Sequence, residues 1–134
     1  MVPEEPSAPS AAGRTLRITS GADKVLREED GIVVWRGFDP ATVGTEISLA
    51  RARAEAGTRI PAHWHSQDTV AYLMDGRAVF RTGEGLNEVR VMEAGEWLFV
   101  PAGLVHEEES PDDVHFDFLY ARDGGGGTTT FLDD

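Results

Sequence analysis

Three of the four histidines in this chain are spaced in a way that suits metal chemistry. His63 and His65 lie two residues apart, so both imidazoles leave the same face of a β-strand. His106 follows Pro101 and Gly103, residue types that bend a chain and let it start a new strand. Three neutral nitrogen donors that converge from two strands can hold a transition metal. The sequence therefore predicts a metal site formed by His63, His65 and His106.

The segments around these histidines resemble the two signature motifs of the cupin family. Residues 57–65 read GTRIPAHWH, and residues 95–106 read GEWLFVPAGLVH. Gly57 precedes His63 by the family's five-residue gap, and the second segment matches the family at its Gly, Pro, Gly and His. The resemblance implies an antiparallel double-sheet jelly roll, a small β-barrel built around a metal. It also implies that subunits pair to cover an open sheet edge, so we expect a homodimer.

The chain departs from the first cupin motif at the position of its carboxylate ligand. The family has a glutamate separated by six residues from the glycine at position 76, and here that position is Thr69, with Asp68 one residue out of phase. A slip of one residue turns a strand side chain to the other face. We therefore expect a three-histidine site without a carboxylate, and Asp68 as a ligand only if the strand is irregular there. Ser110 replaces a common asparagine of the second motif, at a position expected to be structural.

Length and composition limit the class of protein. With 134 residues the chain fits one domain, and no apolar stretch approaches the roughly 20 residues of a membrane helix. The N-terminus lacks the basic region and apolar run of a secretory signal. The chain has no cysteine, which excludes disulfides, thiolate zinc sites and thiol nucleophiles and fits a cytoplasmic protein.

The charge balance argues against two kinds of partner. The formal net charge is −12, from 24 acidic and 12 basic residues, whereas nucleic acid and anionic membranes both select a basic surface. We interpret the acidity as a solubility feature, and the run Glu107–Glu109 mainly as a solvated edge. Within that run, strand alternation would turn Glu108 toward the pocket alongside His106.

The chain divides into a lead-in (residues 1–13), a single domain (14–122) and a Gly/Thr-rich tail (123–134). The lead-in is rich in Pro, Ala, Ser and Glu, and the tail is flexible by composition, although Phe131 and Leu132 are apolar enough to dock on a neighbour. Between them, short apolar segments alternate with Gly-rich turns, a pattern typical of an all-β fold. For residues 45–54 a helix is the alternative prediction, because the segment is rich in alanine. The expected strands are 32–38, 45–54, the segment around His63, 70–74, 78–82, 89–92, 97–100 and 115–121.

A largely apolar substrate pocket should surround the metal. If Thr69 faces inward with the histidines, Ala71 and Leu73 share its face. In the last strand, Phe116, Phe118 and Tyr120 form the obvious core face, which leaves His115 and Asp117 outside. If that strand instead presents its polar side to the cavity, His115 becomes a candidate acid–base catalyst.

Three hypotheses of function stay open. Three histidine ligands leave about three positions on an octahedral ion, enough for a chelating, anionic small molecule together with water or dioxygen. The resemblance to small cupin oxygenases favours a dioxygenase with Fe²⁺, although Zn²⁺, Ni²⁺ and Mn²⁺ also accept imidazole. The alternatives are a non-redox isomerase, decarboxylase or lyase, and a ligand-binding protein without turnover.

Overall fold

The expected all-β architecture is confirmed in a computed structural model of the chain, which describes residues 14–20, 25–29, 32–38, 43–123 and 129–132. The chain contains a 3₁₀ turn, η1 (Glu84–Leu86). The strands are β1 (Val25–Glu29), β2 (Ile32–Arg36), β3 (Ser48–Ala54), β4 (Arg59–His65), β5 (Thr69–Thr82), β6 (Glu88–Glu93), β7 (Trp97–Val100), β8 (His106–Glu109), β9 (Phe116–Arg122) and β10 (Thr129–Phe131).

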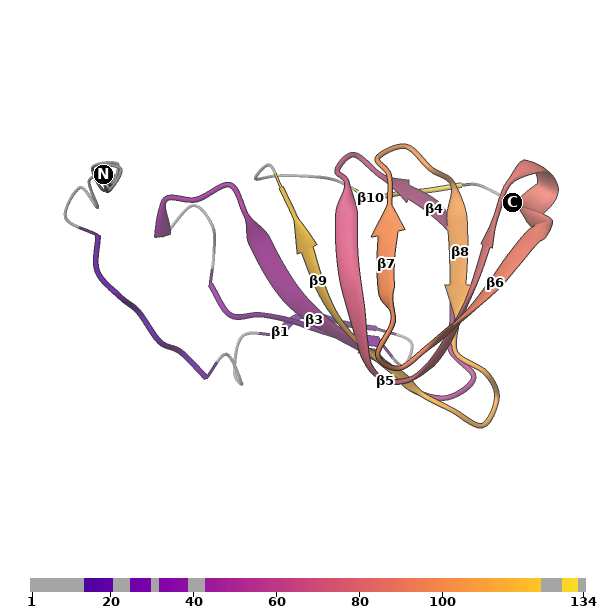
Figure 1. Ribbon diagram of the computed structural model, residues 1–134, viewed down its shortest axis with the longest axis horizontal. Coiled ribbons are helices and arrows are strands. Elements are labelled where there is room, and N and C mark those ends of the chain that lie inside the picture. The colour runs from indigo at the N-terminus through magenta and orange to yellow at the C-terminus, as the bar shows by residue number, and fades with distance from the viewer. Residues whose placement is uncertain (1–13, 21–24, 30–31, 39–42, 124–128, 133–134) are drawn as a thin grey trace, which may run out of the picture.

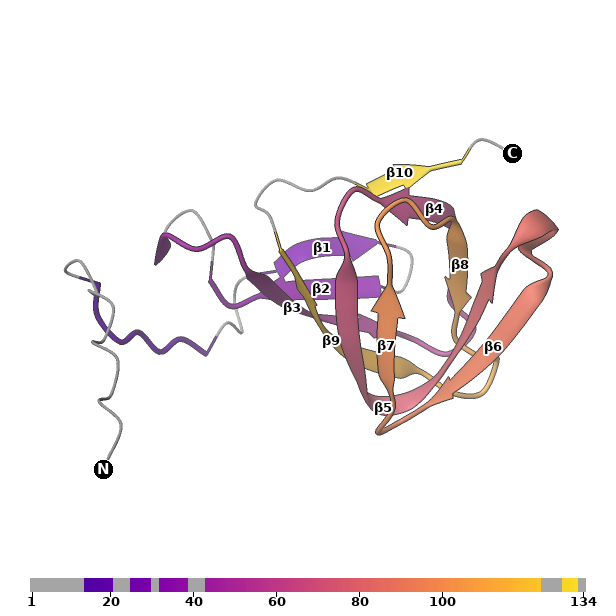
Figure 2. The ribbon, with the colours of Figure 1, turned by 45° about the horizontal axis from the view of Figure 1, so that its top comes forward.

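The strands form two antiparallel sheets that share β5. The first sheet runs β1-β2-β3-β9-β5-β7, and the second runs β10-β4-β8-β5-β6. Figures 1 and 2 show the strands curled round a common interior, with β5 passing from one sheet to the other. The result is the double-sheet jelly roll expected from the sequence.

The expectation of two separate strands, 70–74 and 78–82, with a turn between them is wrong, because β5 runs through both as one bent strand of 14 residues. The register with β9 shifts between Leu73 and Asp75. Gly76 then adopts a φ of +87°, and a β-carbon there would lie only 1.8 Å from the carbonyl oxygen of His115. A glycine therefore lets the strand bend against β9 and enter the second sheet.

Alternation along the strands places the core inside the barrel. On β3, Ala50 and Ala54 are buried while Arg51 and Arg53 point outward, which settles residues 48–54 as strand rather than helix. Burying a large apolar side chain contributes about 1.5–3 kcal/mol, so this interior is the main stabilising element. The buried cluster comprises Ile32, Val34, Ala50, Ala54, Ala71, Leu73, Ala78, Phe80, Met92, Phe116 and Phe118.

The predictions for the two ends of the chain have different outcomes. The predicted lead-in, residues 1–13, lies outside the described residues. Part of the tail, expected to be flexible, instead forms β10, which pairs with β4. A search of the described residues finds no helix long and apolar enough to cross a membrane.

Candidate metal centre

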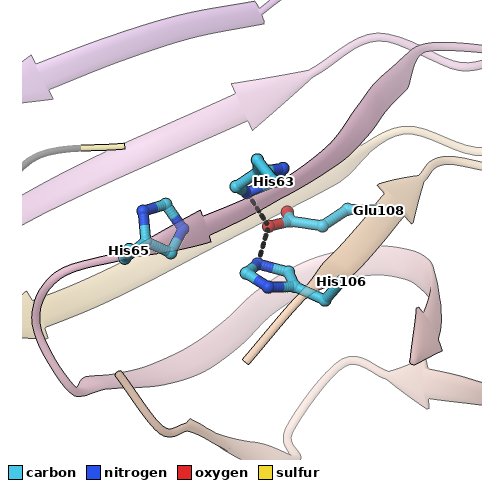
Figure 3. Close-up of side chains that lie close together, drawn as sticks. All are labelled: His63, His65, His106 and Glu108. Atoms are coloured by element: carbon cyan, nitrogen blue, oxygen red, sulfur yellow. Dashed lines mark ion pairs between the residues drawn. The ribbon is translucent and has the colours of Figure 1, made fainter. Parts of the chain in front are cut away.

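Two strands of the second sheet bring four potential ligands together. His63 and His65 come from β4, and His106 and Glu108 come from β8, with His63 directly opposite His106. One donor atom from each of the four lies within 4.8 Å of the others (Figure 3). All three imidazoles are buried, and His106 is only 1% exposed. Within the described residues, these four form the one cluster suited to a metal ion.

The turn between β7 and β8 delivers His106 to the site. Leu104 N–H donates to the Pro101 carbonyl at 3.2 Å, and Gly103 has a φ of +82°, as a tight reversal requires. Gly103 N–H also donates to the carbonyl of His65 at 2.9 Å, which ties the turn directly to the end of β4. The Pro-x-Gly sequence thus joins the two ligand-bearing strands, as its residue types predict.

Each imidazole is oriented through its Nδ1 atom. Nδ1 of His63 lies 2.7 Å from the Pro61 carbonyl, and Nδ1 of His106 lies 2.9 Å from the Leu104 carbonyl. A carbonyl only accepts hydrogen bonds, so both rings carry their proton on Nδ1 and present Nε2 to the site. His65 uses a different partner, the Thr129 hydroxyl of β10, at 2.9 Å.

The surroundings hold two of the imidazoles in the neutral form that binds metal. Burial lowers the pKa of His63, and burial together with the charge of Arg122 lowers the pKa of His65 to about 3. Burial also lowers the pKa of His106, but the hydrogen bond that its charged form donates to Glu108, together with the negative charge of Glu108, outweighs that effect and raises the pKa overall.

The donor set fits a divalent cation. Glu108 Oε1 lies 3.3 Å from Nε2 of His106 and 3.7 Å from Nε2 of His63. Neutral imidazole nitrogens and a carboxylate are all acceptors, so their convergence needs a proton or a cation between them. Three imidazoles and one carboxylate suit Fe²⁺, Mn²⁺, Zn²⁺ or Ni²⁺.

The expectation of a site without a carboxylate is therefore corrected. The carboxylate comes from Glu108 of β8, two residues after His106, where alternation places it on the same face. Asp68 stands apart: it is exposed, and its Oδ1 accepts the Ala102 N–H at 2.8 Å in the β7–β8 turn. Its one-residue offset from Thr69 turns it outward.

The other predicted site residues are split between the cavity, the core and the outer surface. Thr69 and Ala71 line the cavity with the four ligands, whereas Leu73 is fully buried among core residues and is not part of the lining. His115 lies outside the cavity lining, and its Nε2 contacts Asp75 Oδ2 at 2.8 Å.

Sequence reasoning missed Arg122, which lines the same cavity. Its Nε donates to the Thr69 hydroxyl at 2.8 Å, and its Nη2 lies 3.3 Å from Nε2 of His65. Burial lowers its pKa. Arg122 continues the inward alternation of Phe116, Phe118 and Tyr120 by two residues, so the same pattern could have found it.

The ligands open into a small cavity with largely apolar walls. The cavity has a volume of about 120 Å³. Side chains from both sheets surround it, and those that are apolar include Val34, Phe80, Phe116, Phe118, Tyr120 and Phe131. Such a space admits a small molecule and limits the water around it.

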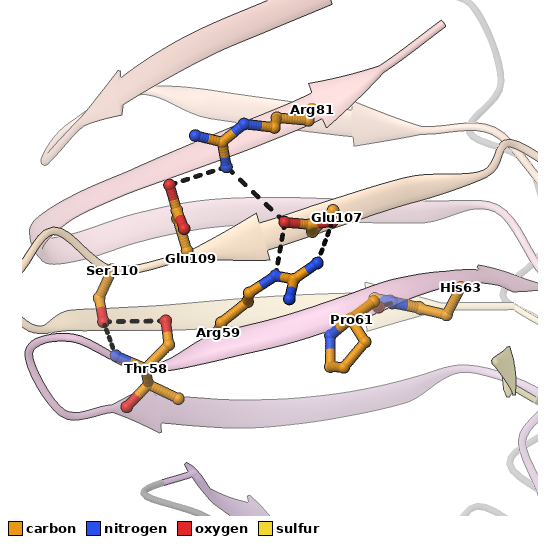
Figure 4. Close-up of polar contacts among 8 residues, drawn as sticks. All are labelled: Thr58, Arg59, Pro61, His63, Arg81, Glu107, Glu109 and Ser110. Atoms are coloured by element: carbon orange, nitrogen blue, oxygen red, sulfur yellow. Dashed lines mark hydrogen bonds and ion pairs between the residues drawn. The ribbon is translucent and has the colours of Figure 1, made fainter. Parts of the chain in front are cut away.

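Polar contacts on the outer side of β8 hold this strand in place (Figure 4). Glu107 accepts two hydrogen bonds from Arg59 of β4, at 2.8 and 2.9 Å, and its Oε1 lies 3.8 Å from Arg81 of β5. Ser110 Oγ accepts the Thr58 N–H at 2.8 Å, which gives Ser110 the structural role expected for it. These contacts fix the strands on both sides of His106 and Glu108.

Fold and site together define a double-sheet β-barrel with a candidate metal centre. The family model described as "Cupin domain" matches residues 50–121, more than half of the sequence, and the chain belongs to the cupin family. A curated relative, germin-like protein subfamily 3 member 2 of Arabidopsis thaliana, is 37% identical over 90 residues. That match covers 58% of this chain but only 40% of the relative.

Solved structures share the fold at low sequence identity. The polyketide cyclase RemF from Streptomyces resistomycificus has a TM-score of 0.72 and 16% identity, over 90% of this chain and 89% of that one. Oxalate decarboxylase from Bacillus subtilis has a TM-score of 0.72 and 20% identity, over 92% and 34%. An oxalate oxidase structure has a TM-score of 0.69 and 22% identity, over 98% and 72%. At these identities the likeness establishes the fold.

Proposed function

We propose that this cupin is a metal-dependent enzyme for a small organic anion, and that its reaction is an oxidation of the dioxygenase type. One observation carries the proposal: donor atoms of His63, His65, His106 and Glu108 lie within 4.8 Å of one another beside a small cavity. Fe²⁺ is the ion we favour, and Mn²⁺, Zn²⁺ and Ni²⁺ suit the same donors.

The fourth ligand narrows how a substrate can bind. Four protein ligands leave about two positions on an octahedral ion, one fewer than three histidines alone. A substrate that took both positions would exclude dioxygen, whereas one that binds through a single atom leaves room for a small gas. The carboxylate of Glu108 also offsets one positive charge of the ion, so an anionic substrate does not have to supply all of the negative charge that balances the ion.

One arginine supports an anionic substrate. Arg122 reaches the cavity beside His65. No carboxylate hydrogen-bonds to its guanidinium among the described residues. A buried cation of this kind attracts an anion, and the hydrogen bond to the Thr69 hydroxyl fixes the direction of the Arg122 guanidinium.

The residues of the chain have separate roles in such a reaction. Arg122 binds and orients an anionic group, and the rings of Phe116, Phe118 and Tyr120 exclude water around it. A bound divalent ion supplies Lewis acidity and, if it is redox-active, an electron. The oxalate oxidase and oxalate decarboxylase of the same fold lend support to a small organic acid as substrate.

An anaerobic experiment tests the oxidation. The protein is loaded with Fe²⁺ and exposed to nitric oxide, a dioxygen surrogate, and we expect an iron–nitrosyl electron paramagnetic resonance signal that small carboxylic acids alter. Absence of that signal, with tight Zn²⁺ or Ni²⁺ binding, would move the assignment to non-redox Lewis-acid chemistry. A signal that no acid changes would favour a ligand-binding protein.

A thermal-shift screen then identifies the acid. A ligand that binds the folded state stabilises it by RT ln(1 + [L]/Kd). We expect the shift caused by the best acid to fall in Arg122→Gln, which removes the guanidinium but keeps a polar side chain. An unchanged shift in that variant would remove Arg122 from the substrate site.

A further inference from the structure

The last described strand, β10, forms one side of the metal centre. In its antiparallel pairing with β4, Thr129 lies opposite His65 and Phe131 lies opposite His63. Paired residues of an antiparallel ladder share a face, so Thr129 and Phe131 face the cavity, which both of them line. Thr130 lies opposite Trp64 and belongs to the other face.

Thr129 orients the ring of His65 through Nδ1, as backbone carbonyls orient the other two imidazoles. Its Oγ1 lies 2.9 Å from Nδ1 of His65. A hydroxyl can donate or accept, but the other ring nitrogen of His65 faces Nη2 of Arg122, which only donates. Nε2 therefore carries the lone pair, and Nδ1–H donates to Thr129. This is the tautomer whose Nε2 lone pair can bind a metal in place of the Arg122 N–H.

Phe131 adds an apolar contact to the same strand pair. Its ring centroid lies 5.2 Å from that of His63, and the neighbouring Leu132 N–H donates to the Ala62 carbonyl at 3.0 Å. The side chain is 43% exposed, so one face of its ring covers the imidazole while the other meets solvent. The strand thus contacts both β4 histidines, one by a hydrogen bond and one by packing.

We propose that Thr129 is a positioning residue of the metal centre, and that metal affinity depends on the docking of β10 against β4. This inference rests on the proposed metal-dependent function. Hydrogen-bond partners of metal-binding histidines set the ring orientation, and their loss typically lowers metal affinity about 10–100-fold. The metal centre is then built from three segments: β4 and β8 supply the ligands, and Thr129 of β10, 64 residues away from His65, orients one of them.

The test compares Thr129→Val, which keeps the shape but loses the hydroxyl, with Thr129→Ser, which restores it. Thr130→Val is the matched control, because the same change is made on the opposite face of β10. Zn²⁺ affinity is measured by competition with a chelator. We expect Thr129→Val to weaken binding about 10–100-fold, and Thr129→Ser and Thr130→Val to remain within about threefold of wild type.

A second readout separates this inference from the proposed function. Nitrogen-15 spectra of the metal-free protein report which nitrogen of His65 carries the proton. We expect the Nδ1–H form in wild type and a mixture of tautomers in Thr129→Val. Equal affinities and equal spectra for Thr129→Val and Thr130→Val would overturn the role of Thr129. A wild type that binds no divalent metal would overturn the proposed function, while the spectra would still decide the positioning role.

Discussion

The two ligand-bearing strands are held in unequal ways. β8, which supplies His106 and Glu108, lies between β4 and β5, and Glu107 ties it to arginines on both. β4, which supplies His63 and His65, has β8 on one side and only the three-residue β10 on the other. The site therefore has a firmly supported half and a half whose geometry depends on the end of the chain.

The largest loss of metal affinity should come from a substitution in the supported half, on β8. His106→Ala removes a nitrogen donor and leaves buried Glu108 without its closest partner, so we expect metal affinity to fall by more than about 100-fold. The metal-free protein should also lose about 1–3 kcal/mol of stability, because a buried polar group loses its hydrogen bond. Elemental analysis and thermal unfolding measure the two effects. Full metal retention would show that the cluster is not a metal site.

The carboxylate of β8 gives the next prediction. Glu108→Gln keeps the size of the side chain but removes the negative charge, and an amide is a poorer ligand for a divalent ion. We expect metal affinity to fall about 10–100-fold or more, measured by chelator competition. The same substitution at the neighbouring Glu109, which pairs with Arg81 outside the cluster, is the control. Equal metal affinities of the two variants would mean that only the three histidines bind the metal.

Anchoring of β8 to its neighbours should appear as a pH-dependent stability. The hydrogen bonds from Arg59 lower the pKa of Glu107 below its usual value of 4.5. A carboxyl whose pKa is lower in the folded state stabilises the fold above its unfolded pKa, and this contribution is lost as the pH falls through the folded value.

Glu107→Gln should therefore cost about 1–2 kcal/mol at pH 7, and the difference from wild type should shrink below about pH 4. Denaturant unfolding at several pH values measures it. A constant difference across that range would mean that the substitution acts through packing rather than through the ion pair with Arg59.

Local patterns were enough to predict the histidines of both halves, and the direction of Glu108, from the sequence. Spacing and turn chemistry placed His63, His65 and His106, and strand alternation turned Glu108 toward them. The family pattern directed attention to Asp68 and Thr69 instead, so the carboxylate was expected to be missing. Alternation describes one strand at a time, and it does not say which strand of a barrel supplies a given ligand.

The support that β10 gives to β4 could not be predicted from the sequence. Pairing of Thr129 with His65 joins residues 64 positions apart, and a Gly-rich segment between them gives no register. The bend of β5 at Gly76 was likewise read as a turn, because a glycine signals both a reversal and a close approach of two backbones. Both features depend on the tertiary fold rather than on local preference.

Asp68 gives the smallest effect and the sharpest contrast with Glu108. Its carboxylate is exposed and accepts one backbone hydrogen bond, from Ala102 in the turn that leads to β8. Asp68→Ala should cost only about 0.5–1 kcal/mol in unfolding experiments, the usual contribution of one such bond. Its metal content, measured by elemental analysis, should equal that of wild type. A metal loss as complete as that of His65→Ala would show that the chain bulges at the start of β5 and turns Asp68 inward. Asp68 rather than Glu108 of β8 would then be the carboxylate ligand.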